Sequence, residues 1–165
     1  MARSARRRIG TPRYRRILWP TDFSALAEAA LPHALALAQG GRAELIVLHV
    51  LSPLTGGIYA APDASGALWG RLAQESRRVA LAELQRRTEQ VGARNSRLRI
   101  RSLLVQGSPV AEIVRTAKRL RCDLIVLATH GRTGLRHMMM GSVAENVVRG
   151  ASCPVLSVRP RADLR

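Results

Sequence analysis

The residues best suited to chemistry in this sequence lie between Asp123 and Ser142. An apolar run, 124–128, leads into Thr129-His130-Gly131, and nine residues later Gly141-Ser142 begin a helix-like pattern. Glycine lets backbone N–H groups approach a ligand without an intervening Cβ, and a helix start adds unpaired N–H groups and a favourable dipole. This spacing is typical of a loop that binds phosphate or another anion.

Several residues of this segment have two interpretations. Ser142 could contact a phosphate, but Ser142-Val-Ala-Glu145 also fits a capping box, in which hydroxyl and carboxylate bind local N–H groups. His130 could bind a ligand or act as a base, although a histidine without a nearby acid is more often structural. Arg132 could screen phosphate charge or simply face solvent.

Asp22 has the strongest functional case among the acidic residues. It follows the first apolar run of the chain, where its carboxylate could accept a hydrogen bond from a ligand amine, a hydroxyl or metal-bound water. With equal weight, the same carboxylate could cap the helix that follows. Both interpretations place Asp22 at the end of a strand.

These residues need a scaffold of alternating strands and helices. Apolar runs and helical periodicity predict strands at 14–19, 44–50, 98–102, 123–128 and 155–158, and helices at 25–39, 67–90, from Pro109 onward and at 142–149. Such alternation predicts an α/β fold with a doubly wound parallel sheet, whose ligands bind outside the carboxyl ends of the strands. Asp22, Val50 and the residues from Thr129 to Gly131 all lie at such ends.

Three local features refine this scaffold. Pro32 should kink the first helix, because it lacks an N–H group, and Gly92 should end the second. Arginines at 97, 99 and 101 alternate with less polar residues, which predicts an edge strand. The Pro-, Gly- and Ala-rich segment 51–65 is long for a connection and could act as a lid.

The charge of the chain is uneven. The formal net charge is +16, and the seven arginines of residues 1–16, a stretch without acids, account for much of it, leaving +9. Residues 1–13 are expected to form a disordered basic arm, 14–160 the folded domain and 161–165 a tail. A nucleic-acid partner bound through the arm is weakly supported, since few aromatic residues are available to stack on bases and base composition of the genome explains arginine use equally well.

Absent motifs limit the chemistry. The sequence has no GxxxxGK[ST], GxGxxG, GxSxG or HExxH pattern and no evident pair of catalytic carboxylates, so binding is favoured over catalysis. Cys122 and Cys153 lack metal-ligand spacing and are expected to be small buried thiols in a reducing cytoplasm. No run approaches the roughly 20 apolar residues of a spanning helix, so the expected location is cytoplasmic, without a membrane.

Five segments together resemble the universal stress protein family: Pro20-Thr-Asp-Phe-Ser24, Leu48-His-Val50, Ala128-Thr-His-Gly-Arg-Thr-Gly134, Met140-Gly-Ser-Val-Ala-Glu-Asn-Val-Val-Arg149 and Ser152-Cys-Pro-Val-Leu-Ser-Val158. The resemblance spans residues 14–159. It implies a five-stranded parallel sheet in the order 3-2-1-4-5, of the adenine nucleotide alpha hydrolase-like (Rossmann-like) type. That order brings Asp22 and Gly131 to one crevice.

The resemblance also implies a ligand. The ATP-binding branch of the family has the pattern G-x-x-G, nine residues, G-[S/T], which this chain matches except that Ala128 replaces the first glycine. The implied cofactor is ATP, with or without Mg²⁺. The implied contacts are Asp22 and the backbone of Val50 to adenine, Ala128 to ribose, and Gly131, Gly141, Ser142 and Val143 to phosphates; Thr21, Arg132 and Gly134 complete the implied site.

The sequence therefore predicts a stress-response regulatory protein that binds adenine nucleotides, with at most slow ATP hydrolysis. Family resemblance further implies a homodimer formed through the last strand, Val155 to Val158. Two alternatives stay open: a dimeric interaction module that binds no nucleotide, which Ala128 motivates, and a nucleic-acid-associated protein.

Overall fold

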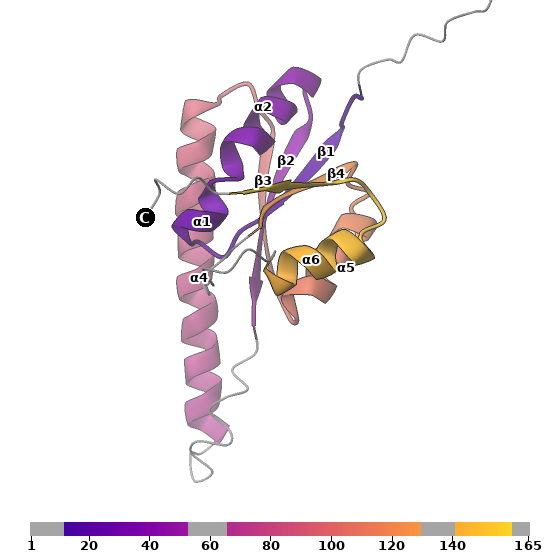
Figure 1. Cartoon of the computed structure of the whole chain (residues 1–165). Helices are drawn as coiled ribbons and strands as arrows, with labels where there is room; N and C mark the ends of the chain where they lie inside the picture. Colours follow the sequence, from indigo (N-terminus) through magenta and orange to yellow (C-terminus); the bar gives the residue numbers. More distant parts are fainter. Residues whose placement is uncertain (1–11, 53–65, 130–140, 160–165) are drawn as a thin grey trace, which may run out of the picture.

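Five parallel strands form the centre of the structure, a computed structural model that describes residues 12–52, 66–129 and 141–159 (Figure 1). The strand order is β3-β2-β1-β4-β5, which confirms the predicted doubly wound sheet. The elements are β1 (Arg16–Pro20), α1 (Ala25–Glu28), α2 (Leu31–Gly41), β2 (Glu44–Leu51), α4 (Gly66–Arg94), β3 (Ile100–Gln106), α5 (Pro109–Arg119), β4 (Leu124–Ala128), α6 (Ser142–Gly150) and β5 (Val155–Val158).

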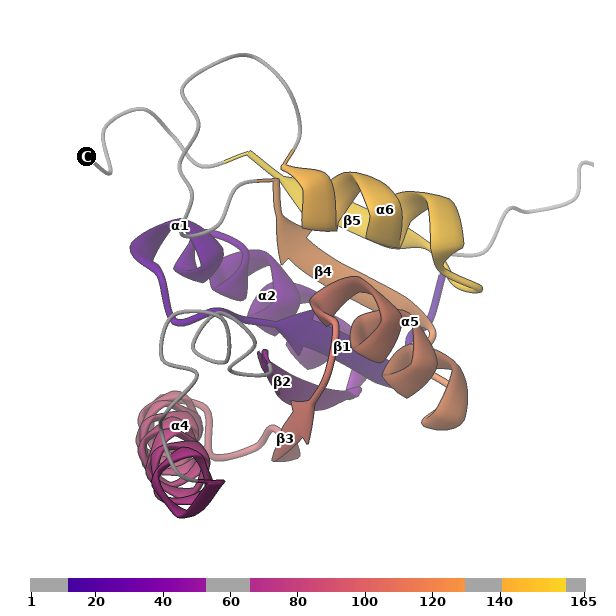
Figure 2. The same ribbon diagram turned by 90° about the horizontal axis from the view of Figure 1, so that it is seen from below.

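Helices cover both faces of the sheet, and each face has its own apolar core (Figure 2). On one face, Ile17, Trp19 and neighbouring strand residues pack against alanines of α2 and against Leu84 of α4. On the other, Leu18 and its neighbours pack against α5 and α6. The strand residues are apolar on both faces because both are buried, as is usual for a parallel sheet.

β1 lies at the centre of the sheet and carries the topological switch point. Leu18 pairs with Ile46 of β2 on one side and with Ile125 of β4 on the other. The chain builds β2 and β3 outward in one direction, then returns to add β4 and β5 in the other. The connections that leave the carboxyl ends of β1 and β4 therefore diverge, which is where doubly wound proteins bind ligands.

The predicted helix at 25–39 is in fact two helices. α1 ends at Glu28, and α2 begins at Leu31 with Pro32 in its first turn. Proline is tolerated there because the first-turn N–H groups have no acceptor within the helix. Pro32 thus starts a helix instead of kinking one.

The prediction that Gly92 ends the long helix is wrong. α4 continues to Arg94, and the Asn95 side chain donates a hydrogen bond of 2.7 Å to the Val91 carbonyl in the last turn. This bond satisfies a carbonyl that the helix end would otherwise leave without a partner. The stop is therefore set by Asn95, three residues later than predicted.

The predicted edge strand is confirmed as β3, although Arg97 and Arg99 lie just before it and only Arg101 lies within it. Cys122 is buried, as predicted, and burial raises the pKa of its thiol to about 11. Cys153 is half-buried, and both thiols are free. Within the described ranges, no helix is both long and apolar enough to cross a membrane.

The expectations for the arm, the lid and the tail lie almost wholly outside the described residues. Pro12 and Arg13 are the only members of the predicted arm that the structure describes, and Leu51 and Ser52 the only members of the predicted lid. Leu51 belongs to β2.

Candidate ligand-binding site

The start of α6 is tied to the end of β4. Gly141 occupies the N-cap position of α6, and its N–H donates a 2.7 Å hydrogen bond to the Thr129 carbonyl. Thr129 in turn donates from its N–H to the Val158 carbonyl of β5, at 2.9 Å. These bonds close the base of the connection between β4 and α6, so the helix start lies at the carboxyl edge of the sheet.

The first turn of α6 has no side-chain cap. Within the described part of the chain, no hydrogen bond is found from the N–H groups of Ser142 and Val143, and both residues are exposed. Of the two interpretations of Ser142, the capping box is wrong: Gly141 occupies the N-cap position, and the Glu145 carboxylate instead accepts a 2.8 Å bond from Arg149. Accessible N–H groups and a hydroxyl at a helix start suit a bound anion.

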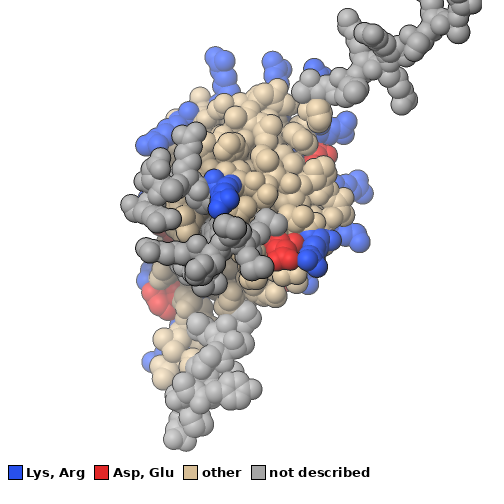
Figure 3. Space-filling view, in the orientation of Figure 1, with Lys and Arg blue, Asp and Glu red and all other residues tan. Residues whose placement is uncertain are grey.

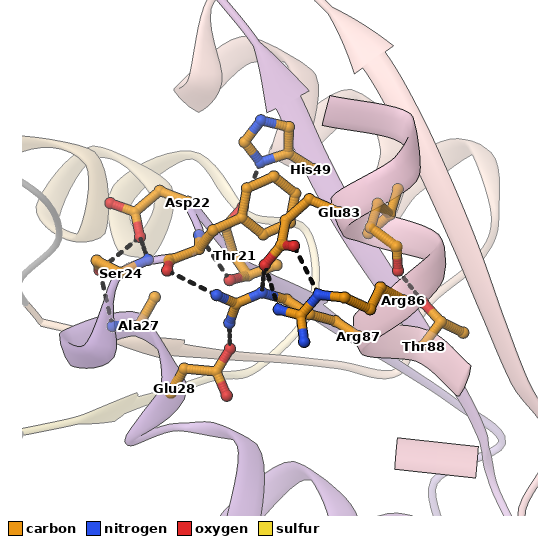
Figure 4. Close-up of polar contacts among 12 residues, drawn as sticks. Thr21, Asp22, Ser24, Ala27, Glu28, His49, Glu83, Arg86, Arg87 and Thr88 are labelled. Atoms are coloured by element: carbon orange, nitrogen blue, oxygen red, sulfur yellow. Dashed lines mark hydrogen bonds and ion pairs between the residues drawn. The ribbon is translucent and has the colours of Figure 1, made fainter. Parts of the chain in front are cut away.

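Asp22 organises the turn between β1 and α1 (Figure 4). Its Oδ1 accepts hydrogen bonds from the Ser24 N–H at 3.0 Å and from the Ser24 hydroxyl at 2.6 Å. Ser24 Oγ then accepts from the Ala27 N–H at 3.1 Å, so Ser24 is the residue that caps α1. Asp22 therefore does not cap α1 itself, as one of its two predicted roles required. It positions Ser24, which does.

A stacked pair of rings lies beside Asp22, and the sequence did not single it out. The Phe23 ring stacks on the His49 ring, with centroids 4.0 Å apart. The backbone of Phe23 has a φ of 66°, in the left-handed region. The buried His49 donates from Nδ1 to the Thr21 carbonyl, at 2.8 Å. Phe23 and His49 both lie in segments that resemble the universal stress protein family. That resemblance was the one feature of the sequence that could have drawn attention to them.

Arg87 of α4 holds this turn from the other side (Figure 4). Its guanidinium donates to the Phe23 carbonyl at 3.0 Å, pairs with Glu28 and Glu83, and lies 5.2 Å from the centroid of the Phe23 ring. Burial lowers the pKa of Arg87, and the nearby Asp22 carboxylate partly offsets this effect. α4 is thereby attached to the turn that carries Asp22.

Arg87→Met is expected to destabilise the fold by about 2 kcal/mol, because a half-buried guanidinium that serves both charged and carbonyl acceptors is lost. Arg86→Met is the matched control: Arg86 contacts the same Glu83, but its side chain is 52% exposed, so a loss below about 0.5 kcal/mol is expected. Urea unfolding of both variants measures the difference. Equal losses would contradict the anchoring role of Arg87.

The remaining predicted residues occupy the same edge or lie outside the described residues. Val50 is half-buried near the end of β2, and Ala128 is the half-buried last residue of β4. The buried Thr21 N–H donates to the Leu48 carbonyl at 2.8 Å. Gly131, Arg132 and Gly134 lie outside the described residues, as does His130.

No metal centre is evident in the parts of the chain that the structure describes: no three His, Cys, Asp or Glu side chains come together there. What the carboxyl edge does present is an uncapped helix start beside an acidic, aromatic turn.

These features define a class of protein: a doubly wound α/β domain, whose switch point between β1 and β4 is the place where such folds bind ligands. A family model described as the universal stress protein family matches residues 13–159. The chain belongs to the universal stress protein family.

Similarity to individual members of the family supports the family assignment. The chain is 35% identical over 154 residues to universal stress protein MJ0531 of Methanocaldococcus jannaschii, covering 92% of this chain and 86% of that protein. It resembles the solved structure of MJ0577, from the same organism, with a TM-score of 0.76 and 30% identity over 90% of this chain and 98% of the other. A universal stress protein solved in complex with cAMP has a TM-score of 0.58 and 25% identity, covering 91% and 100% of the two chains.

Proposed function

We propose that this protein is a regulatory protein of the stress response that binds adenine nucleotides, ATP in particular, at the carboxyl edge of its sheet. One observation carries the proposal. The uncapped start of α6 is fixed to the end of β4 by the Gly141–Thr129 hydrogen bond, and β4 adjoins β1, whose end leads directly into Asp22. An anion-binding helix start and an acidic side chain thus share one side of the switch point.

The residues present fit an adenine nucleotide. The N–H groups of Ser142 and Val143 and the Ser142 hydroxyl would bind phosphate oxygens, together with Gly131, Arg132, Gly134 and Gly141. Asp22, Thr21 and the backbone of Val50 would hold the adenine ring, and Ala128 would lie against the ribose. A structural neighbour that binds cAMP, itself an adenine nucleotide, supports this choice.

Two measurements test the proposal. Mass spectrometry of ligand released from freshly purified protein should identify an adenine nucleotide, and calorimetry with ATP should show binding, with and without Mg²⁺. Hydrolysis of ATP is expected to be slow at most, since no catalytic pair is assigned. No binding at millimolar ATP would refute the proposal.

Ala128→Gly is expected to strengthen ATP binding several-fold, because in the proposed site the Ala128 methyl group would stand where the backbone must approach the ribose. Ala128→Val should weaken binding for the same reason. Glycine within a strand costs about 0.5–1 kcal/mol, so the tighter-binding variant should also melt at a lower temperature. Calorimetry measures the ATP affinity of the parent protein and the two variants. The same affinity with glycine, alanine and valine at position 128 would show that Ala128 does not contact the nucleotide.

A homodimer through β5 is part of the proposal. β5 is the last strand of the sheet. The carbonyl of Pro154, just before β5, accepts from Ile125 of β4, and the carbonyl of Val158 accepts from Thr129, just after β4, so the backbone groups of Val155 and Ser157 point away from β4. Those groups could pair with a second copy of the strand.

Ser157→Pro should convert the dimer to a monomer while leaving the fold intact, since it removes an N–H group that β4 does not use. Ser157→Ala keeps that N–H group and is the control. Sedimentation velocity gives the oligomeric state. A Ser157→Pro protein that remains dimeric would place the interface elsewhere.

The second candidate function is a dimeric interaction module without a nucleotide, which Ala128 favours. Purified protein that carries no nucleotide and shows no thermal shift with ATP would support this alternative. Both functions are proposed for the cytoplasm, where the free thiols of Cys122 and Cys153 would persist.

A further inference from the structure

Arginines without an ion pair collect at the edge of the sheet opposite the proposed nucleotide site, where the strands begin. All are exposed, and none forms an ion pair with another described residue. They precede four neighbouring strands: Arg13 and Arg15 before β1, Arg42 before β2, Arg94, Arg97 and Arg99 before β3, and Arg121 before β4. We call this set of seven the amino-edge arginines.

Among the described residues, the two acids nearest the starts of these strands, Glu44 and Asp123, already have partners. Glu44 pairs with Arg16 at 3.4 Å and with Arg101 at 3.3 Å. Asp123 Oδ2 accepts from the backbone N–H groups of Arg15 and Arg16, at 2.6 and 2.8 Å. Helices α2, α4 and α5 also end here, and each carries a partial negative charge of roughly one half, which offsets only part of the positive charge.

A hollow lies within this surface, between the end of α2 and the connection from α4 to β3. Its volume is about 880 Å³, its charged lining residues are Arg42, Arg94, Arg97 and Arg99, and no acid is among the described residues that line it. A 2.6 Å hydrogen bond from Gln39 Nε2 to Asn95 Oδ1 joins the two sides. The described residues that line the hollow thus come from α2, from the end of α4 and from the chain that follows each helix.

The dimensions of the surface suit an extended polyanion. Strands lie about 4.8 Å apart, so the backbone from β3 to β4 spans about 14 Å before arginine side chains extend it. Figure 3 shows basic side chains projecting along the top and right of the molecule, with few acidic ones between them. A small anion would occupy the hollow alone, whereas a nucleic-acid backbone presents phosphates at intervals along the whole row.

We propose that the amino-edge arginines bind the phosphate backbone of duplex nucleic acid without reading its sequence. The only aromatic side chain at this edge among the described residues is Tyr14, so the stacking that single strands require is largely missing. Guanidinium groups bind phosphate oxygens well, often through two bonds. The surface lies away from the nucleotide site, so the proposal stands whether or not ATP binds.

The test uses the full chain and fluorescence anisotropy with a labelled 20-base-pair duplex, as DNA and as RNA, over a salt series. Arg42→Gln/Arg97→Gln/Arg99→Gln removes three amino-edge arginines. Arg71→Gln/Arg77→Gln/Arg159→Gln is the matched control, because these arginines are also exposed and without an ion pair among the described residues, but lie on α4 and after β5. Both variants lose the same net charge.

The amino-edge variant should reduce the slope of log K against log salt by about 3 and weaken binding to both duplexes at least about tenfold. The control should keep a slope within about 1 of the parent protein. Failure of the parent protein to bind at low salt, or equal losses in both variants, overturns the proposal. Tighter binding to single strands than to duplexes also overturns it. A further variant lacks residues 1–11; if only this deletion, and not the amino-edge variant, weakens duplex binding, the proposal is overturned as well.

Discussion

Gly141→Val should weaken ATP binding at least about 100-fold, equivalent to about 2.7 kcal/mol. Gly141 has φ −59° and ψ 145°, a conformation that valine adopts readily, so the fold should survive the change. The added side chain would stand at the helix start, where phosphate oxygens must approach the N–H groups of Ser142 and Val143. Calorimetry with ATP measures the loss, and thermal melting checks the fold.

The control is Gly92→Val, which adds the same side chain within α4, where a Cβ meets no other atom within 4 Å. It should leave ATP affinity unchanged. If Gly141→Val bound ATP as the parent protein does, the start of α6 would not be the phosphate site, whatever ligand the protein carries.

Leu84→Ala should destabilise the domain by about 3 kcal/mol. α4 runs from Gly66 to Arg94, yet its buried residues are only Ala80, Leu84 and Val91, all at or after its midpoint. Leu84 is the large one, fully buried against the sheet. Its truncation leaves a cavity at the main attachment point of a helix that is otherwise largely exposed.

Leu81→Ala tests whether the loss reflects burial or helix composition, because Leu81 lies one turn earlier on the same helix and is 39% exposed. Its expected cost is below about 0.5 kcal/mol. Urea unfolding of the two variants should separate them clearly. A small loss for Leu84→Ala would mean that α4 is held mainly by the Arg87 contacts.

Periodicity and apolar runs were enough to predict the strands and most helix positions. They failed at ends that depend on single side chains. Pro32 fits either a kink or a helix start, and only the packing of α2 decides between them. Gly92 is compatible with a helix once Asn95 supplies the terminating hydrogen bond.

The candidate site was predicted through motifs, and its described members lie at the predicted edge. The Arg87 network was missed because its partners are distant in sequence: Arg87 and Phe23 are 64 positions apart. Nothing local in α4 distinguishes Arg87 from Arg86, its exposed neighbour. The capping-box interpretation failed for the opposite reason: a local pattern was present, but the helix begins one residue earlier than that pattern requires, so Gly141 and not Ser142 holds the N-cap position.

The length of the strands limits how strongly charges at one edge of the sheet act on a ligand at the other edge. β2 has eight residues, which at about 3.3 Å each separate the two ends of the sheet by about 26 Å. At physiological ionic strength the Debye length is about 8 Å, so exposed charges at one end are largely screened from the other. A nucleotide at the carboxyl edge would therefore gain little from the amino-edge arginines, and its affinity should respond weakly to salt even in a chain with a formal charge of +16.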